Sequence, residues 1–213
     1  MSHVLHPPVY TLHVQVEGID PPVWRRIEVP ASIPLRGLHD IIQTVFGWEG
    51  AHLHLFEIGG ERYGLGDNEY DEDEHDDAAV LLGDVVQNAG SGFLYRYDFG
   101  DDWYHAIRLE QVRRDVAPKE VPRLVAGERA GPPEDCGGVP GYLELLEAIT
   151  DSEHEDHAAA VECGRGAAMT PRNSISTVRT AGSSGIGAVP RRRVRRSAGP
   201  PVAPALVIPG GAM

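Results

Sequence analysis

Acidic and imidazole side chains gather in the aromatic segment from Tyr95 to His105. Its first half alternates, so we expect a strand, and Gly100 permits a bend that would re-aim the aspartates after it. Two further histidines, His52 and His54, are spaced i, i+2, which places both on one face of a strand. Together these side chains could form a site of mixed nitrogen and oxygen donors, which suits zinc or manganese. The candidate metal ligands are His52, His54, Asp98, Asp101 and His105.

A thiol stands in the segment Pro132-Pro-Glu-Asp-Cys-Gly-Gly138. The amides of the glycines could approach Cys136 and lower its pKa, and His105 would then complete a thiol–imidazole pair. The alternative is a rigid turn in which Cys136 is a small buried filler. In a metal-assisted hydrolase or nuclease, Glu134 or Asp135 would act as the base. The catalytic candidates are Glu134, Asp135 and Cys136.

A ligand groove is another use for the aromatic and charged residues. Its candidate residues are Trp24, Arg25, Arg26, Tyr97, Asp98, Asp102 and Trp103. The alternative is that the aromatic rings pack in the core, while the arginines offset carboxylates such as Glu28 or the Asp101–Asp102 pair. Because no recognisable nucleophile and base come together, we expect a non-enzymatic binding or interaction module that uses this aromatic and acidic patch to bind a protein or a small ligand. A metal-assisted hydrolase or nuclease is the alternative.

The spacing of apolar residues predicts the elements that position these side chains. Alternation with a period of two indicates strands over 9–17, 23–29, 52–58, 93–99 and 103–112. A helical spacing begins at Leu35 and ends at Gly47, and further helices are expected over 78–86, 142–149 and 151–161. Strands that cluster in this way predict an α+β fold, with a mainly antiparallel sheet and helices packed on one face.

Charge divides the chain into a body, residues 1–162, and a tail, residues 163–213. The net charge is −13, and all 32 acidic residues precede Cys163. Eight of these acidic residues lie in the run from Asp67 to Asp77, which we expect to be a solvated loop. The tail has eight arginines and a composition that predicts disorder. Arg191 to Arg196 could attract nucleic acid, which the body would repel.

No apolar run suits a membrane span and no signal peptide is present, so we expect a cytoplasmic protein with no membrane partner.

Six motifs run in order through residues 9–160: Pro21-Pro-Val-Trp-Arg-Arg26, Leu38-His-Asp-Ile-Ile42 with Gly47-Trp48, His52-Leu-His-Leu-Phe56, Tyr97-Asp-Phe-Gly-Asp-Asp-Trp103, Gly127-Glu-Arg-Ala130 and Pro132-Pro-Glu-Asp-Cys-Gly-Gly138. With these motifs the body resembles the plasmid pRiA open-reading-frame-three-like family, some members of which are labelled insertion-element passengers of transposon-resolvase type. The resemblance implies an α+β domain of bacterial plasmid or mobile-element origin and no established activity. Family members continue with an acidic segment that this chain lacks. One hypothesis is that the tail from about Cys163 is the product of a shifted reading frame.

Overall fold

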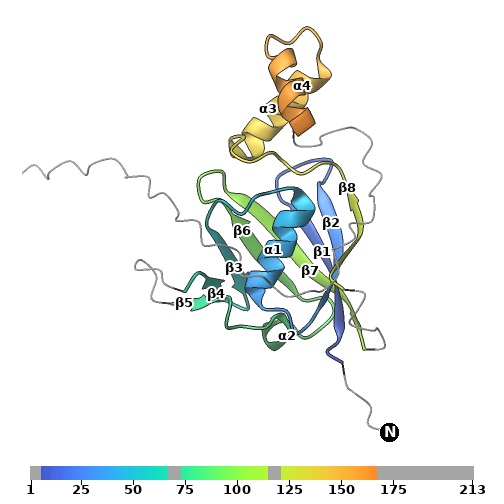
Figure 1. Cartoon of the computed structure of the whole chain (residues 1–213), viewed down its shortest axis with the longest axis vertical. Coiled ribbons are helices and arrows are strands. Elements are labelled where there is room, and N and C mark those ends of the chain that lie inside the picture. The colour runs from blue at the N-terminus through green and yellow to red at the C-terminus, as the bar shows by residue number, and fades with distance from the viewer. Residues whose placement is uncertain (1–5, 67–72, 115–120, 167–213) are drawn as a thin grey trace, which may run out of the picture. The chain divides into compact units, whose positions relative to one another are not determined.

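Residues 6–66, 73–114 and 121–166 are described by the computed structural model. Their strands form one sheet of eight strands in the order β5-β4-β3-β6-β7-β1-β2-β8, antiparallel except for the pair β4–β5 (Figure 1). The elements are β1 (Val9–Val16), β2 (Trp24–Pro30), α1 (Leu35–Phe46), β3 (His54–Ile58), β4 (Glu61–Gly64), β5 (Glu74–Asp76), α2 (Leu82–Val85), β6 (Gly92–Tyr97), β7 (Trp103–Arg113), β8 (Arg123–Glu128), α3 (Gly138–Thr150) and α4 (His157–Gly166). The predicted α+β fold is confirmed. None of the described helices is long and apolar enough to cross a lipid bilayer.

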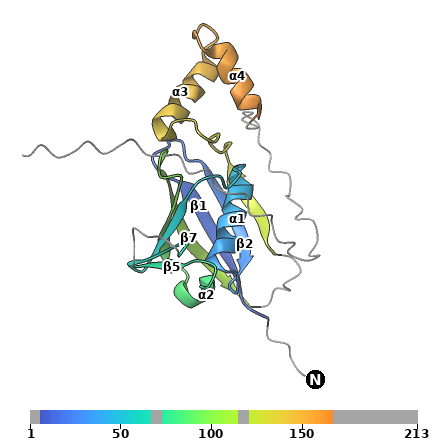
Figure 2. The same cartoon turned by 60° about the vertical axis from the view of Figure 1, so that its left-hand side comes forward.

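Side chains alternate across the central strands, so one face of the sheet forms the core. Leu12 and Val14 of β1, and Ile107 and Leu109 of β7, are fully buried on that face. The residues between them, such as Arg108, lie on the opposite face, as the period of two requires. Helix α1 crosses the buried face, which is visible in both Figure 1 and Figure 2.

Helix α1 contributes an apolar stripe to this core. The buried residues of the stripe are Leu35, Leu38, Ile42 and Phe46, which follow the helical period. The helix ends at Phe46 and is capped by Gly47, where φ is 85° and the amide donates to the carbonyl of Gln43 at 3.0 Å. Glycine takes this left-handed conformation without steric cost, so the chain can turn sharply toward β3.

The bend between β6 and β7 is present where the sequence predicts it, but aspartates take its left-handed conformations. Asp98 has a φ of 54° and Asp102 a φ of 57°. The Oδ1 atom of Asp98 accepts a hydrogen bond from the Gly100 amide at 2.9 Å, and its carbonyl accepts one from the Asp102 amide at 2.6 Å. Because a left-handed residue with a side chain costs about 1–2 kcal/mol, the surrounding contacts must hold this bend in place.

The segment between β8 and α3 is packed against this bend, and residues 131–137 of it are called the docked loop below. Trp48 Nε1 donates a hydrogen bond to the carbonyl of Pro132 at 2.8 Å. The amide of Gly137 donates to Asp101 Oδ2 at 3.1 Å. These bonds tie the docked loop to the end of α1 on one side and to the β6–β7 bend on the other.

Some elements differ from the prediction. Strand β8 is not among the predicted strands, since its six residues are too short to show clear alternation. Strand β5 forms at the end of the acidic run that we expected to be a solvated loop. The helix expected over 151–161 begins only at His157, as α4. Asp151 instead caps the end of α3: its amide donates to the Glu147 carbonyl, and its carboxylate accepts a hydrogen bond from the Glu153 amide. Helix α4 extends beyond the expected boundary at residue 162, so residues 163–166 of the tail that we expected to be disordered are helical; the rest of that tail, residues 167–213, lies outside the described residues.

Gly131 allows the docked loop to approach α1, since a Cβ atom at this position would overlap the carbonyl oxygen of Phe46. We expect Gly131→Ala to lower the free energy of unfolding by about 1–3 kcal/mol, the usual cost of overpacking. Urea denaturation measures this change. Gly92→Ala is the control, because its Cβ would make only an ordinary contact of 3.6 Å with Ile107. Equal stability of the two variants would contradict the close docking of the loop.

Candidate functional site

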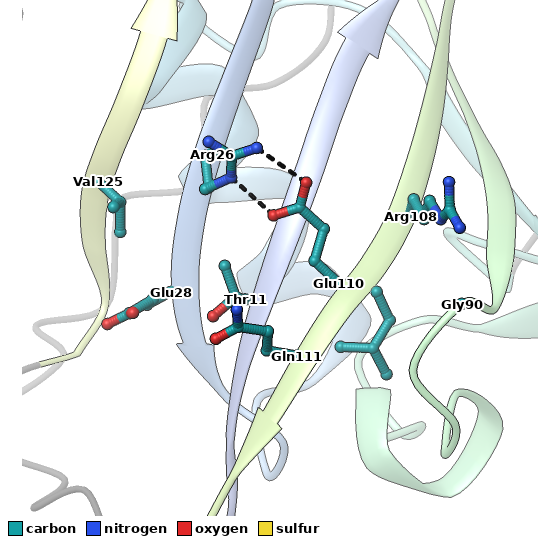
Figure 3. A pocket seen from close by; sticks show the side chains of 9 residues that line it. Thr11, Arg26, Glu28, Gly90, Arg108, Glu110, Gln111 and Val125 are labelled. Carbon is teal, nitrogen blue, oxygen red and sulfur yellow. Dashed lines mark hydrogen bonds and ion pairs between the residues drawn. The ribbon is translucent and has the colours of Figure 1, made fainter.

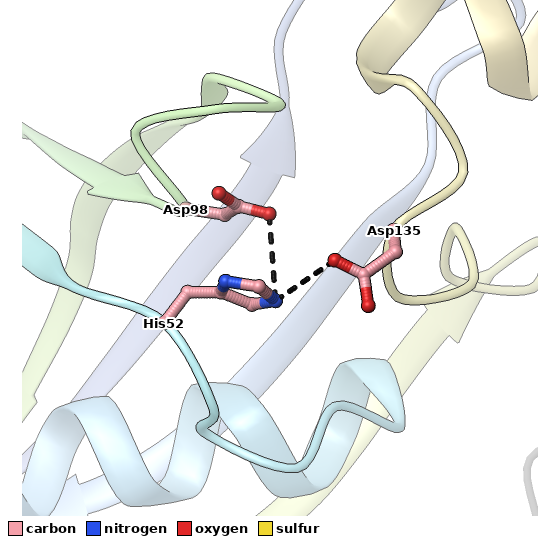
Figure 4. A group of neighbouring side chains, drawn as sticks. All are labelled: His52, Asp98 and Asp135. Carbon is pink, nitrogen blue, oxygen red and sulfur yellow. Dashed lines mark ion pairs between the residues drawn. The ribbon is translucent and has the colours of Figure 1, made fainter. Parts of the chain in front are cut away.

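One imidazole and two carboxylates from three separate segments converge next to the β6–β7 bend (Figure 4). His52 lies in the connection between α1 and β3, Asp98 follows β6, and Asp135 belongs to the docked loop. The Nε2 atom of His52 is 3.6 Å from Asp98 Oδ2 and 3.1 Å from Asp135 Oδ1. One ligand atom from each of the three residues lies within 4.8 Å of the other two. We call His52, Asp98 and Asp135 the imidazole–carboxylate site.

A third carboxylate, that of Glu134, borders this site. Its Oε2 atom is 3.6 Å from His52 Nε2. Its Oε1 atom accepts hydrogen bonds from the Tyr97 hydroxyl at 2.9 Å and from the Glu49 amide at 2.8 Å. Burial, and then the hydrogen bond to Glu134, raise the pKa of Tyr97, so the phenol stays protonated and continues to donate. Glu134 is therefore held at a fixed position beside the imidazole.

Both aspartates of the site have strained backbones. Asp98 and Asp135 each have a φ of 54°, in the left-handed region that side chains rarely adopt. Residues kept in such conformations cluster at functional sites, because the surrounding structure must offset a cost of about 1–3 kcal/mol. Two of the four described non-glycine residues with a positive φ, Asp98 and Asp135, therefore lie at this site.

The site fits a divalent cation. Ligand atoms around a tetrahedral zinc ion at 2.0–2.2 Å lie about 3.3–3.6 Å apart, and the separations between His52 Nε2 and the carboxylate oxygens bracket that range. His52 Nε2 is shielded from solvent and has no hydrogen-bond partner. In the part of the chain that the structure describes, no Arg or Lys forms an ion pair with Asp98, Glu134 or Asp135. One nitrogen and several carboxylate oxygens are donors that suit zinc or manganese.

Three of the predicted metal ligands are not brought into this site. His54 is buried and bonds through Nε2 to Asp77 Oδ2 at 2.7 Å. Asp101 accepts the hydrogen bond from the Gly137 amide and so anchors the docked loop. His105 is fully buried, with its ring against Phe46 and Trp48, because it alternates with core residues along β7. Of the five predicted ligands, His52 and Asp98 meet, and Asp135, which we considered as a base, joins them.

The expected activation of Cys136 is wrong. Burial, followed by the negative charge of Asp101, raises the pKa of the thiol to about 12. The glycines after Cys136 do not offset this effect; the amide of Gly137 is bonded to Asp101 instead. His105 makes its hydrogen bond to the carbonyl of Trp103 and forms none with the thiol. Cys136 is half-buried and packs against the core, which is closer to the filler of the alternative interpretation than to a reactive thiol.

The predicted ligand-binding patch is divided between the core and other faces of the sheet. Trp103 is buried next to Trp48 and Tyr142, and Asp102 pairs with Arg96 on the surface. Only Tyr97 and Asp98 of that set lie at the imidazole–carboxylate site.

The three patch residues of β2 have partners of their own. Trp24 donates to Glu128 at 3.2 Å, and buried Arg25 donates to the carbonyl of Val45 at 2.8 Å. Arg26 binds Glu110 through two hydrogen bonds rather than Glu28 or the Asp101–Asp102 pair. Each arginine thus offsets a local acceptor, although the expected carboxylates were the wrong ones.

A buried polar network beside the site was missed by sequence reasoning. Asp77, which ends the acidic run, has no exposed surface and accepts hydrogen bonds from Arg36 and His54. Burial alone would raise the pKa of Asp77, but these two bonds outweigh it and lower the pKa. The ring of His54 stacks on that of His39, with centroids 3.6 Å apart. This network joins α1, β3 and the end of the acidic run.

Comparisons with known proteins agree on the fold and the family. The profile of the family described as plasmid pRiA4b ORF-3-like protein matches residues 8–171. Uncharacterized protein y4hQ of Sinorhizobium fredii (strain NBRC 101917 / NGR234) is 40% identical over 158 residues, or 73% of this chain and 81% of that protein. The crystal structure of a protein of unknown function, MM3350 from Methanosarcina mazei Go1, has a TM-score of 0.65 and 38% identity, and the match covers 74% of this chain and 89% of that chain.

Two buried imidazoles predict that acid weakens the fold. Burial lowers the pKa of His39 to about 3 and that of His105 to about 4, whereas an imidazole in an unfolded chain titrates near about 6.5. Between these values the unfolded chain binds more protons, so the free energy of unfolding decreases as the pH falls below about 6.5, by up to about 1.4 kcal/mol per pH unit for each imidazole.

Urea denaturation at several pH values between 7 and 5 measures this slope. In His105→Leu the slope should decrease by the contribution of one imidazole, while the His39 contribution remains. A wild-type stability that does not change over this interval would contradict the neutral, buried state of both rings.

Proposed function

This chain belongs to the plasmid pRiA4b ORF-3-like protein family, and from the geometry around His52 we propose that its domain is a non-enzymatic binding module that holds a divalent cation, zinc or manganese. The observation that carries the proposal is the convergence of His52 Nε2 with oxygens of Asp98 and Asp135, within 4.8 Å of one another. Three carboxylates around one imidazole repel one another at neutral pH. A divalent cation would turn this repulsion into attraction.

The surroundings of the site favour binding over catalysis. Cys136 is not an activated nucleophile, because its pKa is raised. Glu134 already accepts hydrogen bonds from Tyr97 and Glu49. Two exposed apolar side chains, Leu53 at 50% exposure and Phe99 at 37%, directly follow His52 and Asp98 in the sequence. Exposed apolar side chains of this kind suit the recognition of a protein or a small ligand.

Metal-assisted hydrolysis is the second candidate function. It is favoured by the number of ligands, because catalytic metal sites with three protein ligands keep a position open for water. Glu134, at 3.6 Å from His52 Nε2, would be the base that takes a proton from that water. A hydrolase or nuclease of this type would need Glu134 to exchange its present hydrogen-bond donors for the water.

We expect the full chain to bind about one zinc or manganese ion per molecule, measured by titration calorimetry and by metal analysis after dialysis. Asp98→Asn and Asp135→Asn should each weaken binding at least tenfold, since each removes a charged ligand. Asparagine tolerates the left-handed backbone, so these variants change the charge without changing the turn. His52→Ala should also abolish stoichiometric binding.

His75→Ala is the matched control, because it removes an exposed imidazole that faces a carboxylate, Glu61, outside the site. Equal loss of the ion in this variant, or no binding by the wild type, would contradict the proposal. Hydrolysis of a phosphodiester by the metal-loaded protein, lost in Glu134→Gln while the ion is retained, would favour the hydrolase.

Nucleic-acid binding through Arg191–Arg196 concerns residues outside the described part of the chain. If the tail acts only through its charge, deletion of residues 163–213 should remove any affinity for DNA or RNA that falls with rising salt. Filter binding at two salt concentrations measures this. Salt-sensitive affinity that persists after the deletion would point to the body instead.

A further inference from the structure

The face of the sheet opposite α1 carries an open hollow of about 570 Å³ across β1, β2 and β7 (Figure 3). This volume lies within the range of small-molecule sites. The hollow shares no residue with the imidazole–carboxylate site. The residues that line it include Thr11, Arg26, Glu28, Arg108, Glu110 and Gln111.

Positive charge is concentrated on this face of an otherwise acidic body. Residues 1–162 contain 11 basic residues against 32 acidic ones. Four of the 11, Arg26, Arg108, Arg113 and Arg123, lie here with three carboxylates, those of Glu28, Glu110 and Glu128. Glu110 is bound by Arg26, and Glu28 is bound by both Arg113 and Arg123. The face therefore keeps a positive charge after its internal pairs are counted.

Several polar groups of this face are unused within the described residues. The side chain of Arg108 is exposed and makes no hydrogen bond or close ion pair, although its charge helps to lower the pKa of Glu110 after the bond from Arg26. Thr11 is only 5% exposed, yet its hydroxyl has no hydrogen-bond partner. Nε of Arg113 is also buried without a hydrogen bond, and Nδ1 of His13 makes none either, although it lies 4.0 Å from Glu110 Oε1. A buried polar atom without a partner costs about 1–3 kcal/mol, so the Thr11 hydroxyl favours a ligand or a water that hydrogen-bonds to it.

We propose that this hollow binds a small molecule that carries a carboxylate or a phosphate. The guanidinium of Arg108 offers the planar fork of donors that matches either oxyanion. The Thr11 hydroxyl and the Gln111 amide supply further hydrogen bonds from the floor of the hollow. Because the rest of the body repels anions, this basic face is where an anion can reach the domain. The inference does not depend on the proposed metal site.

The test is a titration of the full-length, 15N-labelled chain, with inorganic phosphate in one arm and succinate in the other. We expect saturable shifts of the amide resonances of Thr11, Gly90 and Gln111. Arg108→Gln should raise the apparent dissociation constant at least about tenfold, as expected for the loss of a charge-assisted hydrogen bond. Thr11→Val keeps the side-chain shape and should also weaken binding. The stronger of the two anions identifies the oxyanion class.

Arg62→Gln is the control, since it removes the same charge from β4, near the other edge of the sheet. Equal weakening in Arg62→Gln would show that only net charge matters and would overturn the proposal. Shifts confined to the arginines of the tail, or no shift with either anion, would also overturn it. His52→Ala should bind the anion unchanged, so failure of the metal site and failure of this site are distinguishable.

Discussion

The docking of residues 131–137 against the β6–β7 bend is the contact on which the site depends. Hydrogen bonds from Trp48 to Pro132 and from Gly137 to Asp101 hold the two ends of this loop. A side chain at Gly131 would overlap the backbone of α1, so the approach itself requires glycine. With the loop in this position, Asp135 faces His52 across a gap of 3.1 Å. The side chains that could bind an ion come from three segments, and only this docking brings them together.

The carboxylates around His52 differ from the other buried carboxylates of the domain in the charged side chains that accompany them. A carboxylate buried beside other carboxylates is unfavourable unless a cation compensates for it. Elsewhere in the domain the compensation is built in: Arg36 and His54 bind the buried Asp77, and two arginines bind Glu28. Around His52 the described residues offer these carboxylates no Arg or Lys, and the imidazole itself is their ion-pair partner; Asp98 is buried, whereas the side chain of Asp135 is 76% exposed. The contrast between compensated and uncompensated carboxylates is what distinguishes a structural ion pair from a candidate binding site.

Local patterns in the sequence were sufficient for the fold and for part of the site. The period of two predicted β1 and β7, the helical stripe predicted α1, and Gly47 predicted its end. The same alternation places His105 with Ile107 and Leu109, so its burial was open to prediction, whereas we considered it only as a ligand. Asp77 could not be assigned, because its partner Arg36 is 41 residues away and an acidic run normally indicates a solvated loop. The role of Asp135 depends on the docked loop, a tertiary contact that no local spacing reveals.

Anomalous X-ray diffraction from crystals of the zinc-loaded protein tests the central claim most directly. The account predicts a single strong anomalous peak within bonding distance of His52 Nε2 and of carboxylate oxygens from Asp98 and Asp135. A peak at another position, or a zinc-free site in which Asp135 points away from the imidazole, would contradict it.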